Sequence, residues 1–256
     1  MSDRREREKR KEERLQEESK ISSQDRRTRI LQLAAGAVFL VVAVVLVLIV
    51  VNSASNGDSG DSNLEEVAEV NELLDGIPQQ ELVLGDPSAK VELIEFADLQ
   101  CPYCRAYSEN TLPQVIEKKI ASGAAKLVYR NFPILGQDSF TAGAAAIAAG
   151  AQGRGWNFIE LFYRNQGKEG SGYVTDEFLT SIAKGAGVKN IQQWNSDRES
   201  PKTIAKVEKT YEEAGSKFGF EGTPSFLARG PGTDGYEKVE YSESPASFEQ
   251  AIDEAG

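Results

Sequence analysis

Histidine is absent from this 256-residue sequence, and cysteine occurs only twice, at Cys101 and Cys104. A structural zinc site takes about four cysteine or histidine ligands, which is more than the chain offers. Covalent haem attachment requires a histidine directly after the second cysteine, where this sequence has Arg105. These absences exclude both kinds of centre, and the sequence predicts no metal ion and no cofactor.

Charged side chains are absent from the 19 residues between Leu33 and Val51. That length is sufficient to cross the hydrocarbon core of a bilayer, so residues 31–51 are predicted to form a transmembrane helix. A buried core helix is a weaker interpretation, because the run is apolar on all sides. A cleaved signal peptide, with the small residues 53–55 at its cleavage site, is the other alternative, although the stretch before the run is unusually long for one.

Lysine and arginine are also absent between residues 52 and 89, whereas Lys20, Arg26, Arg27 and Arg29 precede the apolar run. By the positive-inside rule, the end of a membrane span that carries more basic residues stays in the cytoplasm. We therefore expect a single-pass plasma-membrane protein with a cytoplasmic amino terminus and an extracytoplasmic carboxy-terminal part.

Residues 1–30 contain 11 Lys/Arg and 8 Asp/Glu and almost no apolar side chains. They cannot bury enough surface to offset the entropy of ordering, which predicts a disordered cytoplasmic tail. The interspersed acids disfavour a nucleic-acid-binding tail. Removing the tail from the totals of 29 basic and 40 acidic residues leaves 18 and 32, a net charge of −14 for the exported part. That charge disfavours nucleic acid as a partner there too.

Residues 52–76 are predicted to be a spacer between the membrane and the folded domain. The stretch from residue 52 to 63 is rich in Ser, Asn, Gly and Asp, which is typical of a flexible linker. Apolar residues then recur near helical spacing up to Leu74, which indicates a short amphipathic helix that ends at Gly76 and Pro78. We expect one folded domain over residues 77–256.

The folded domain begins with a strand, helix, strand pattern. Residues 91–96 and 125–132 have the composition of strands, and residues 103–122 that of a helix, with a kink expected at Pro113. A crossover of this length predicts parallel pairing of the two strands and an α/β fold.

The second half of the domain is predicted to be mostly helical. Residues 139–218 read as helix throughout and accommodate four or five helices. Two short strands over residues 225–229 and 238–241 follow, separated by glycine-rich turns. A last helix is expected with Ser244 as its amino-terminal cap.

Cys101-Pro102-Tyr103-Cys104 stands at the junction between the first strand and its helix. Backbone N–H groups at a helix start favour a thiolate, so Cys101 is the predicted nucleophile, and Cys104, one turn further in, is the predicted resolving thiol. Thiol–disulfide exchange would form a mixed disulfide at Cys101 that Cys104 then resolves. An inert structural disulfide is the alternative, but so short a loop stabilises a protein little.

Two segments flanking the helical block carry a resemblance to a known family. The run from Glu95 to Cys104 and the later Gly222-Thr223-Pro224-Ser225-Phe226 resemble the DsbA-like thiol-disulfide oxidoreductases of the thioredoxin superfamily, in the membrane-anchored or Gram-positive branch. The resemblance covers roughly residues 77–256. It implies an α/β thioredoxin fold with an inserted all-helical domain at about 139–218, preceded here by the transmembrane helix.

The resemblance also implies roles for residues around the cysteine pair. Pro224 matches the family's cis-proline, and the backbone of Thr223 would pair with a client strand. Glu95 matches a buried acid that relays a proton for Cys104, the alternative being a solvated carboxylate at a strand end. Pro102 and Tyr103, between the cysteines, complete the predicted substrate-binding residues.

The direction of electron flow is the point at which the sequence departs from the family. Many DsbA-type oxidases have histidine where this chain has Tyr103, and the residues between the cysteines influence the reduction potential. We expect an enzyme that forms disulfides in exported cysteine-containing clients and is reoxidised by a membrane quinone-linked thiol oxidase, as the family implies. The alternatives are a reductase or isomerase of exported disulfides, and a chaperone-like client-binding module with an incidental disulfide.

Overall fold

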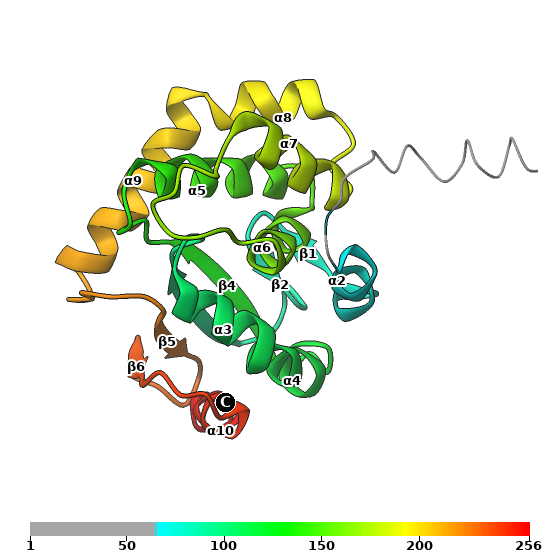
Figure 1. The fold of residues 1–256 in the computed structure, drawn as a ribbon. Helices are drawn as coiled ribbons and strands as arrows, with labels where there is room; N and C mark the ends of the chain where they lie inside the picture. The colour runs from blue at the N-terminus through cyan, green and yellow to red at the C-terminus, as the bar shows by residue number, and fades with distance from the viewer. Residues whose placement is uncertain (1–63, 65) are drawn as a thin grey trace, which may run out of the picture. The chain divides into compact units, whose positions relative to one another are not determined.

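The computed structural model describes residue 64 and residues 66–256 (Figure 1). The predicted cytoplasmic tail, the predicted transmembrane segment 31–51 and the linker stretch 52–63 lie outside the described residues. Within the described part, no helix has both the length and the apolar character needed to span a bilayer.

A six-stranded mixed sheet forms the centre of the domain, in the order β1-β2-β4-β3-β5-β6. The strands β3 and β4 pair in parallel, with Val91 opposite Ala125 and Ala97 opposite Asn131. All other neighbours are antiparallel. The strands are β1 (Gln79–Gln80), β2 (Val83–Leu84), β3 (Val91–Ala97), β4 (Ala125–Asn131), β5 (Ser225–Arg229) and β6 (Glu237–Val239).

Strand β3 lies between β4 and β5, and every residue in it except Glu92 is buried. A strand that is covered on both faces is expected to be apolar on both faces, and Glu95 is the one charged residue of this strand that is buried. The predicted parallel pairing with β4 is confirmed. This strand leads directly into the cysteine pair, so its position in the sheet determines where the pair lies.

The predicted helix over residues 103–122 is interrupted. It consists of α3 (Pro102–Asn110), α4 (Leu112–Val115) and the π-helix η1 (Ile116–Ile120). The break falls at Thr111, two residues before Pro113, because proline lacks the N–H for the helical ladder and its ring crowds the carbonyl of Glu109. The expected kink is therefore confirmed, but it lies before the proline.

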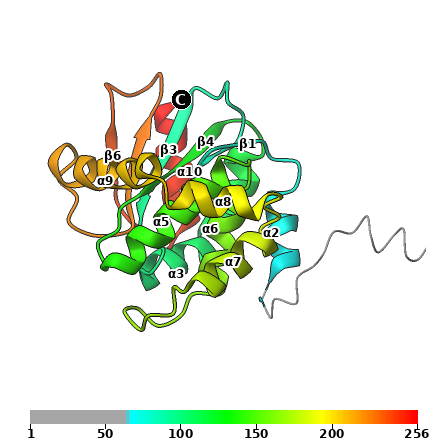
Figure 2. The same ribbon diagram turned by 90° about the horizontal axis from the view of Figure 1, so that it is seen from above.

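Five helices make up the predicted helical insertion. They are α5 (Gln137–Gly150), α6 (Gly155–Arg164), α7 (Asp176–Gly185), α8 (Ile191–Arg198) and α9 (Pro201–Ser216). Figure 1 shows α5, α7, α8 and α9 together on one side of the domain, and Figure 2 shows them over the sheet. The expectation of helix throughout is wrong for residues 165–175, a loop with two glycines at positive φ, Gly170 and Gly172, where helical bonding ends.

Two further helices, α2 (Val67–Leu74) and α10 (Pro245–Ala255), cover the domain. Val70 and Leu74 of α2 are buried in the main apolar core, so α2 packs as part of the folded domain although its residues were expected in the spacer. Ser244 is the residue before α10, as expected, but its side chain makes no capping hydrogen bond.

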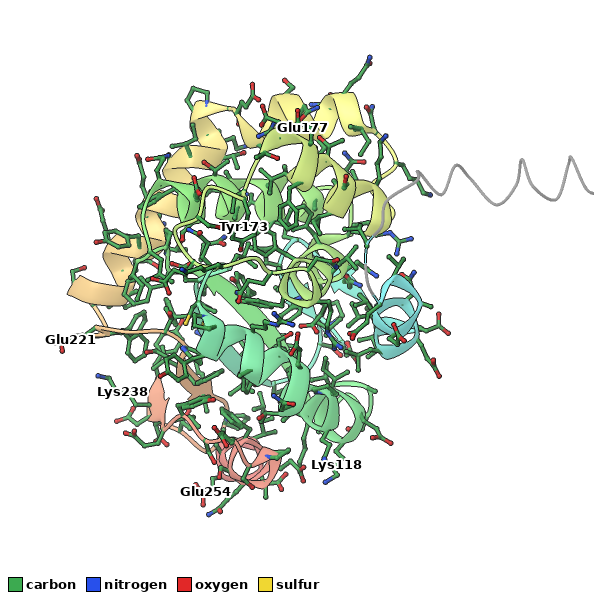
Figure 3. All side chains as sticks on the ribbon, viewed as in Figure 1. Lys118, Tyr173, Glu177, Glu221, Lys238 and Glu254 are labelled. Atoms are coloured by element: carbon green, nitrogen blue, oxygen red, sulfur yellow. The ribbon has the colours of Figure 1, made fainter. Side chains whose placement is uncertain are left out.

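The sheet separates two apolar cores. The larger core includes Leu93, Leu127 and Phe226 and is covered by α3, α4, α6 and α10, whereas Ile94, Phe96 and Leu227 point to a smaller core under the end of α9. Long charged side chains such as Lys118, Glu177 and Glu254 project from the outside of the domain (Figure 3). A small set of polar side chains is buried inside the domain, and Glu95, Asp98 and Gln100 of this set lie shortly before Cys101 in the sequence.

The hairpin of β1 and β2 was not predicted from the sequence, since strands of two residues show no alternation of apolar and polar side chains. Strand β6 covers Glu237–Val239 rather than residues 238–241.

Candidate active site

Cys101 occupies the amino-terminal cap position of α3, and Pro102 is the first residue of the helix. Proline suits this position because the N–H that it lacks would have no partner inside the helix. Cys104 follows one turn later and is fully buried, and both thiols are free. Cys101 is 5% exposed, so the first turn of α3 carries one slightly exposed cysteine and one that is fully enclosed.

Hydrogen bonding gives Cys101 an unusually low pKa. A hydrogen bond from the Cys104 thiol lowers the pKa of Cys101 to about 6, assisted by the backbone N–H groups of Cys104 and Tyr103, while burial opposes the shift. Thiolate is the nucleophilic form of cysteine, so at neutral pH Cys101 is largely in its reactive form.

Cys104 has the opposite character. Burial raises its pKa well above the ordinary value, and the hydrogen bond to Cys101 raises it further. Cys104 therefore remains a protonated thiol at neutral pH, and it must lose that proton before it can attack a disulfide.

Glu95 lies at the base of the site, on the face of β3 that points to the larger core. Its side chain is 1% exposed, and its Oε1 atom has no hydrogen-bond partner. Burial raises the pKa of Glu95 well above the ordinary value, and the charges of Glu160 and Cys101 raise it further. The solvated strand-end interpretation of Glu95 is therefore wrong, and the carboxyl has the proton affinity that a relay to Cys104 requires.

The loop before β5 completes the outer side of the site. The Thr223–Pro224 peptide bond is cis, and the carbonyl oxygen of Thr223 lies 3.4 Å from Cys101 Sγ, where it accepts a hydrogen bond from the protonated form of that thiol. The side chain of Tyr103 is 66% exposed beside the cysteines. The structure thus brings Pro102, Tyr103, Thr223 and Pro224 together around Cys101.

Asp98 connects the loop before Cys101 to the loop after β4. Its side chain is 1% exposed and accepts hydrogen bonds from the backbone N–H groups of Gln100, Ile134 and Leu135 at 2.8, 2.8 and 2.9 Å. Each of those donors would otherwise lie near the interior without a partner. This carboxylate therefore holds the backbone that presents the nucleophile.

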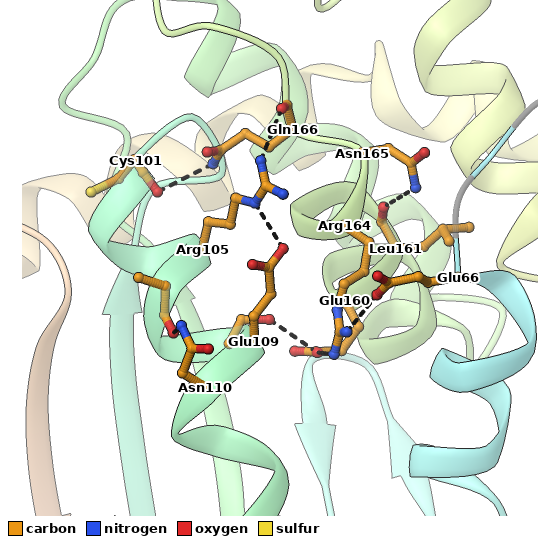
Figure 4. Close-up of polar contacts among 12 residues, drawn as sticks. Glu66, Cys101, Arg105, Glu109, Asn110, Glu160, Leu161, Arg164, Asn165 and Gln166 are labelled. Carbon is orange, nitrogen blue, oxygen red and sulfur yellow. Dashed lines mark hydrogen bonds and ion pairs between the residues drawn. The ribbon is translucent and has the colours of Figure 1, made fainter. Parts of the chain in front are cut away.

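Gln166, in the loop after α6, holds the same segment from the other side. Its side-chain amide donates to the carbonyl oxygens of Leu99 and Cys101 at 2.7 and 3.2 Å, as Figure 4 shows for Cys101. The backbone carbonyl oxygen of Gln166 accepts a hydrogen bond from the side chain of Arg105. Arg105 Nε also forms an ion pair with Glu109 Oε1 at 2.7 Å. The helical insertion is thereby attached directly to the cysteine loop.

Metal ligands do not gather at this site. Among the residues that the structure describes, no three His, Cys, Asp or Glu side chains are close enough together to hold an ion. The arrangement can perform thiol–disulfide exchange with its own groups, namely a thiolate, a resolving thiol and a buried acid.

Comparison with known proteins agrees with this geometry. A family model described as Thioredoxin matches residues 78–254, which is more than half of the chain. The chain belongs to the thioredoxin family.

Within the thioredoxin family, the sequence is similar to disulfide bond formation proteins. It is 34% identical over 163 residues to the probable disulfide bond formation protein D of Bacillus cereus, covering 62% of this chain and 74% of that protein. It is 24% identical over 159 residues to disulfide bond formation protein D of Bacillus subtilis, covering 60% of this chain and 71% of that one.

Solved structures show the same fold. The crystal structure of oxidised BdbD from Bacillus subtilis matches with a TM-score of 0.60 at 20% identity, covering 71% of this chain and 98% of that chain. The crystal structure of alpha-DsbA1 from Wolbachia pipientis matches with a TM-score of 0.57 at 24% identity, covering 73% and 95%. This member of the thioredoxin family is a DsbA-like thiol-disulfide oxidoreductase.

Three polar residues of the site were missed from the sequence: Asp98, Gln166 and Glu160. Glu160 is fully buried in α6, where every residue from Gly155 to Tyr163 is buried. An acidic residue inside the bulky run from Trp156 to Phe162 is the signal that pointed to it, since such a run indicates a core helix. No comparable signal marks Asp98 or Gln166, because most of their partners are backbone atoms distant in the sequence.

Proposed function

We propose that this chain is a membrane-tethered extracytoplasmic oxidase that forms disulfides in exported proteins. The observation that carries the proposal is the difference in acidity within the cysteine pair, with the pKa of Cys101 lowered to about 6 and that of Cys104 raised. A stabilised thiolate favours the reduced form of the pair. A pair whose reduced form is stabilised is a stronger oxidant of other thiols.

The size of this effect follows from the acidity of Cys101. At pH 7 a thiol with a pKa of about 6 has about ten thiolates for each thiol, which stabilises the reduced protein by about 1.4 kcal/mol, or about 30 mV for a two-electron couple. The pKa lies between the values of about 7 in thioredoxin and about 3.5 in DsbA. We therefore expect a moderate oxidant.

Equilibration of the full chain with glutathione buffers of known potential tests the direction of electron flow. We expect a reduction potential above the roughly −270 mV of thioredoxin and below the roughly −120 mV of DsbA. In cells, alkylation should find the pair mainly oxidised. A potential at or below that of thioredoxin, with a mainly reduced pair in cells, would contradict the oxidase and favour the reductase.

The tether is supported by the uncharged run from Leu33 to Val51 and by the basic residues that precede it. Two epitope tags test it, one before Met1 and one after Gly256, in intact cells treated with an external protease. The tag after Gly256 should be digested and the other protected, with the chain in the membrane fraction. Release of the tagged domain into the medium would instead identify the apolar run as a cleaved signal peptide.

Clients and a reoxidising partner complete the proposal. Names of the Bacillus relatives refer to disulfide bond formation, which supports exported cysteine-containing proteins as clients. The electron acceptor that we propose, a membrane quinone-linked thiol oxidase, rests on the resemblance to the DsbA-like family. The variant Cys104→Ala keeps the nucleophile but cannot resolve its mixed disulfides, so it should accumulate both classes of protein bound through Cys101. Recovery of a membrane thiol reductase in place of an oxidase would contradict this partner.

A further inference from the structure

Glu160 is a second buried acid beside the site, and it comes from the helical insertion rather than from the sheet. Its side chain is 0% exposed. The Oε2 atom accepts a hydrogen bond from Ser108 Oγ at 3.0 Å and lies 3.7 Å from Arg164 Nη2 (Figure 4). The Oε1 atom has no hydrogen-bond partner. One oxygen of this carboxyl is therefore held in place, and the other is free to exchange a proton.

Three buried polar atoms without hydrogen-bond partners belong to residues of three elements that interact electrostatically with one another. They are Oε1 of Glu95 on β3, the hydroxyl of Tyr107 on α3 and Oε1 of Glu160 on α6. The hydroxyl of Tyr107 interacts electrostatically with both carboxyls, and the two carboxyls interact with each other. A buried polar atom without a partner destabilises a protein, so a group of three needs an explanation beyond packing.

The charges around Glu160 connect it to the surface on the side away from the cysteines. Arg164, on the same helix, lies between Glu160 and Glu66, to which its Nη1 atom donates a hydrogen bond at 2.6 Å (Figure 4). The Glu66 side chain is 43% exposed. From α3, Glu109 adds a negative charge that opposes ionisation of Glu160. The groups that face Glu160 are thus one arginine, Glu95, Glu66, Glu109 and the hydroxyls of Ser108 and Tyr107.

We propose that Glu160 exchanges a proton with Glu95 whenever the disulfide between Cys101 and Cys104 forms or breaks, so that two carboxyls in sequence carry the proton of Cys104. Glu160 acts through Glu95 and does not touch the sulfur atoms. The inference rests on thiol–disulfide exchange at this site and applies in either direction of electron flow.

The proton balance follows the resolving step. Cys101 is joined to a client sulfur, and the thiol of Cys104 gives its proton to Glu95, which passes a proton to Glu160. The Cys104 sulfur then attacks Cys101, forming the Cys101–Cys104 bond and breaking the bond to the client, whose sulfur leaves as a thiolate with the electron pair. When a client thiolate opens the disulfide, the proton returns to Cys104 by the reverse route.

The environment of Glu160 suits this role at neutral pH. Burial raises its pKa to about 7, although Arg164 and Ser108 act in the opposite direction. A group whose pKa is near the ambient pH both accepts and releases protons readily. Burial also raises the pKa of Tyr107 well above its ordinary value, so its hydroxyl keeps its proton and can donate a hydrogen bond.

The test is the pH dependence of the resolving step in Glu160→Gln. A glutathione mixed disulfide at Cys101 is formed in the full chain, and release of glutathione by Cys104 is followed between about pH 5.5 and 8.5, around the neutral pH that Glu160 is proposed to serve. Cys101 does not titrate in the mixed disulfide, so the profile reports the proton path of Cys104. We expect the wild-type rate to rise through a midpoint near 7, the value to which the pKa of Glu160 is raised. Glu160→Gln should lose that midpoint and resolve about tenfold more slowly at pH 7.5, because its amide accepts no proton.

Two further variants complete the test. Glu249→Gln makes the same acid-to-amide change at a surface ion pair with Lys118 and should leave the profile unchanged. Ser108→Ala removes a hydrogen bond that lowers the pKa of Glu160, so the midpoint should move to higher pH.

A Glu160→Gln profile that keeps its midpoint and its rate would overturn the inference. If Glu160→Gln does not fold, an unchanged midpoint in Ser108→Ala would overturn it as well. Failure of the wild-type chain to form any mixed disulfide at Cys101 would contradict the exchange reaction itself, which is a separate result.

Discussion

The outer side and the base of the site impose opposite acidities on two cysteines that are one helical turn apart. On the outer side, Cys101 accepts hydrogen bonds beside the exposed Tyr103, and its pKa is lowered. At the base, Cys104 lies among buried acids and its pKa is raised. Both residues are cysteines, so their positions along α3 determine which sulfur is the nucleophile.

The acids follow the same division. Glu95 and Glu160 at the base are fully buried with raised pKa values, whereas Asp86, on the surface, has its pKa lowered by hydrogen bonds from Ser88. Burial without sufficient compensation favours the neutral form of a carboxyl. The base of the site therefore holds protons, and the negative charge on the outer side is that of the Cys101 thiolate.

Replacing each cysteine in turn should have the largest effect on activity, and the two effects should differ. Cys101→Ser removes the thiolate and is expected to reduce dithiol oxidation by at least about a thousandfold, since the hydroxyl is a poor nucleophile without an activating base. Cys104→Ser should retain attack at Cys101 and accumulate mixed disulfides. The measurement is client oxidation together with mass analysis of trapped species. Equal accumulation in both variants would show that the two sulfurs are interchangeable.

Replacing Asp98 tests whether its hydrogen bonds hold the backbone that presents Cys101. Asp98→Ala leaves three backbone N–H groups near the interior without an acceptor, so we expect a loss of about 2–4 kcal/mol in the free energy of unfolding, measured by denaturant titration. Asp86→Ala is the matched control, because it removes bonds at the surface from the N–H and hydroxyl of Ser88. If the two variants lose equal stability, the buried carboxylate does not hold the loop.

The raised pKa of Glu95 makes the free energy of unfolding depend on pH, and the direction of that dependence can be predicted. Below its ordinary value of 4.5, Glu95 is protonated in both the folded and the unfolded chain and contributes nothing. As pH rises above that value, the unfolded chain ionises while the folded one keeps its proton, so the wild type loses stability relative to Glu95→Gln. We expect Glu95→Gln to gain at least about 1.4 kcal/mol on the wild type between pH 4 and pH 7, one pKa unit being about that much.

Thermal or urea unfolding of both proteins across this range measures the difference. A difference that stays constant with pH would mean that the pKa of Glu95 is not raised in the folded protein.

Substitutions at Tyr103 should have the smallest effect of those considered, because its side chain is exposed. Tyr103→His places a donor beside the Cys101 sulfur and should lower its pKa further, raising the reduction potential by about 30 mV for each tenfold stabilisation of the reduced form. Tyr103→Phe has no such donor and serves as the control. Stability should change by less than about 0.5 kcal/mol in both. If the wild type and both variants have the same reduction potential, the residue at position 103 does not determine that potential.

The parts of the fold that the sequence predicted well are those with long local patterns. Strands β3 and β4, their parallel pairing and the five-helix insertion follow from apolar runs and spacing. The β1–β2 hairpin is too short to carry such a pattern, and the glycines of the loop over residues 165–175 were read together with the helices around them.

The site was predictable only where a motif or a resemblance identified it. The cysteine pair is visible by itself, and Glu95, Thr223 and Pro224 were found through the family pattern. Glu160 and Gln166 come from the inserted helices and act through contacts 52 and 65 residues distant in the chain, with Ser108 and Cys101. Such contacts depend on how α6 packs against α3, which no local pattern reveals.

The two thiols have opposite acidities, and pH-dependent alkylation of the reduced full chain, followed by peptide mapping, measures both of them. The structure predicts that Cys101 reacts with a midpoint at a pH of about 6 and that Cys104 does not titrate in the neutral range. Two cysteines that share one midpoint near the ordinary value of 9.0, or a Cys104 that ionises before Cys101, would contradict the account.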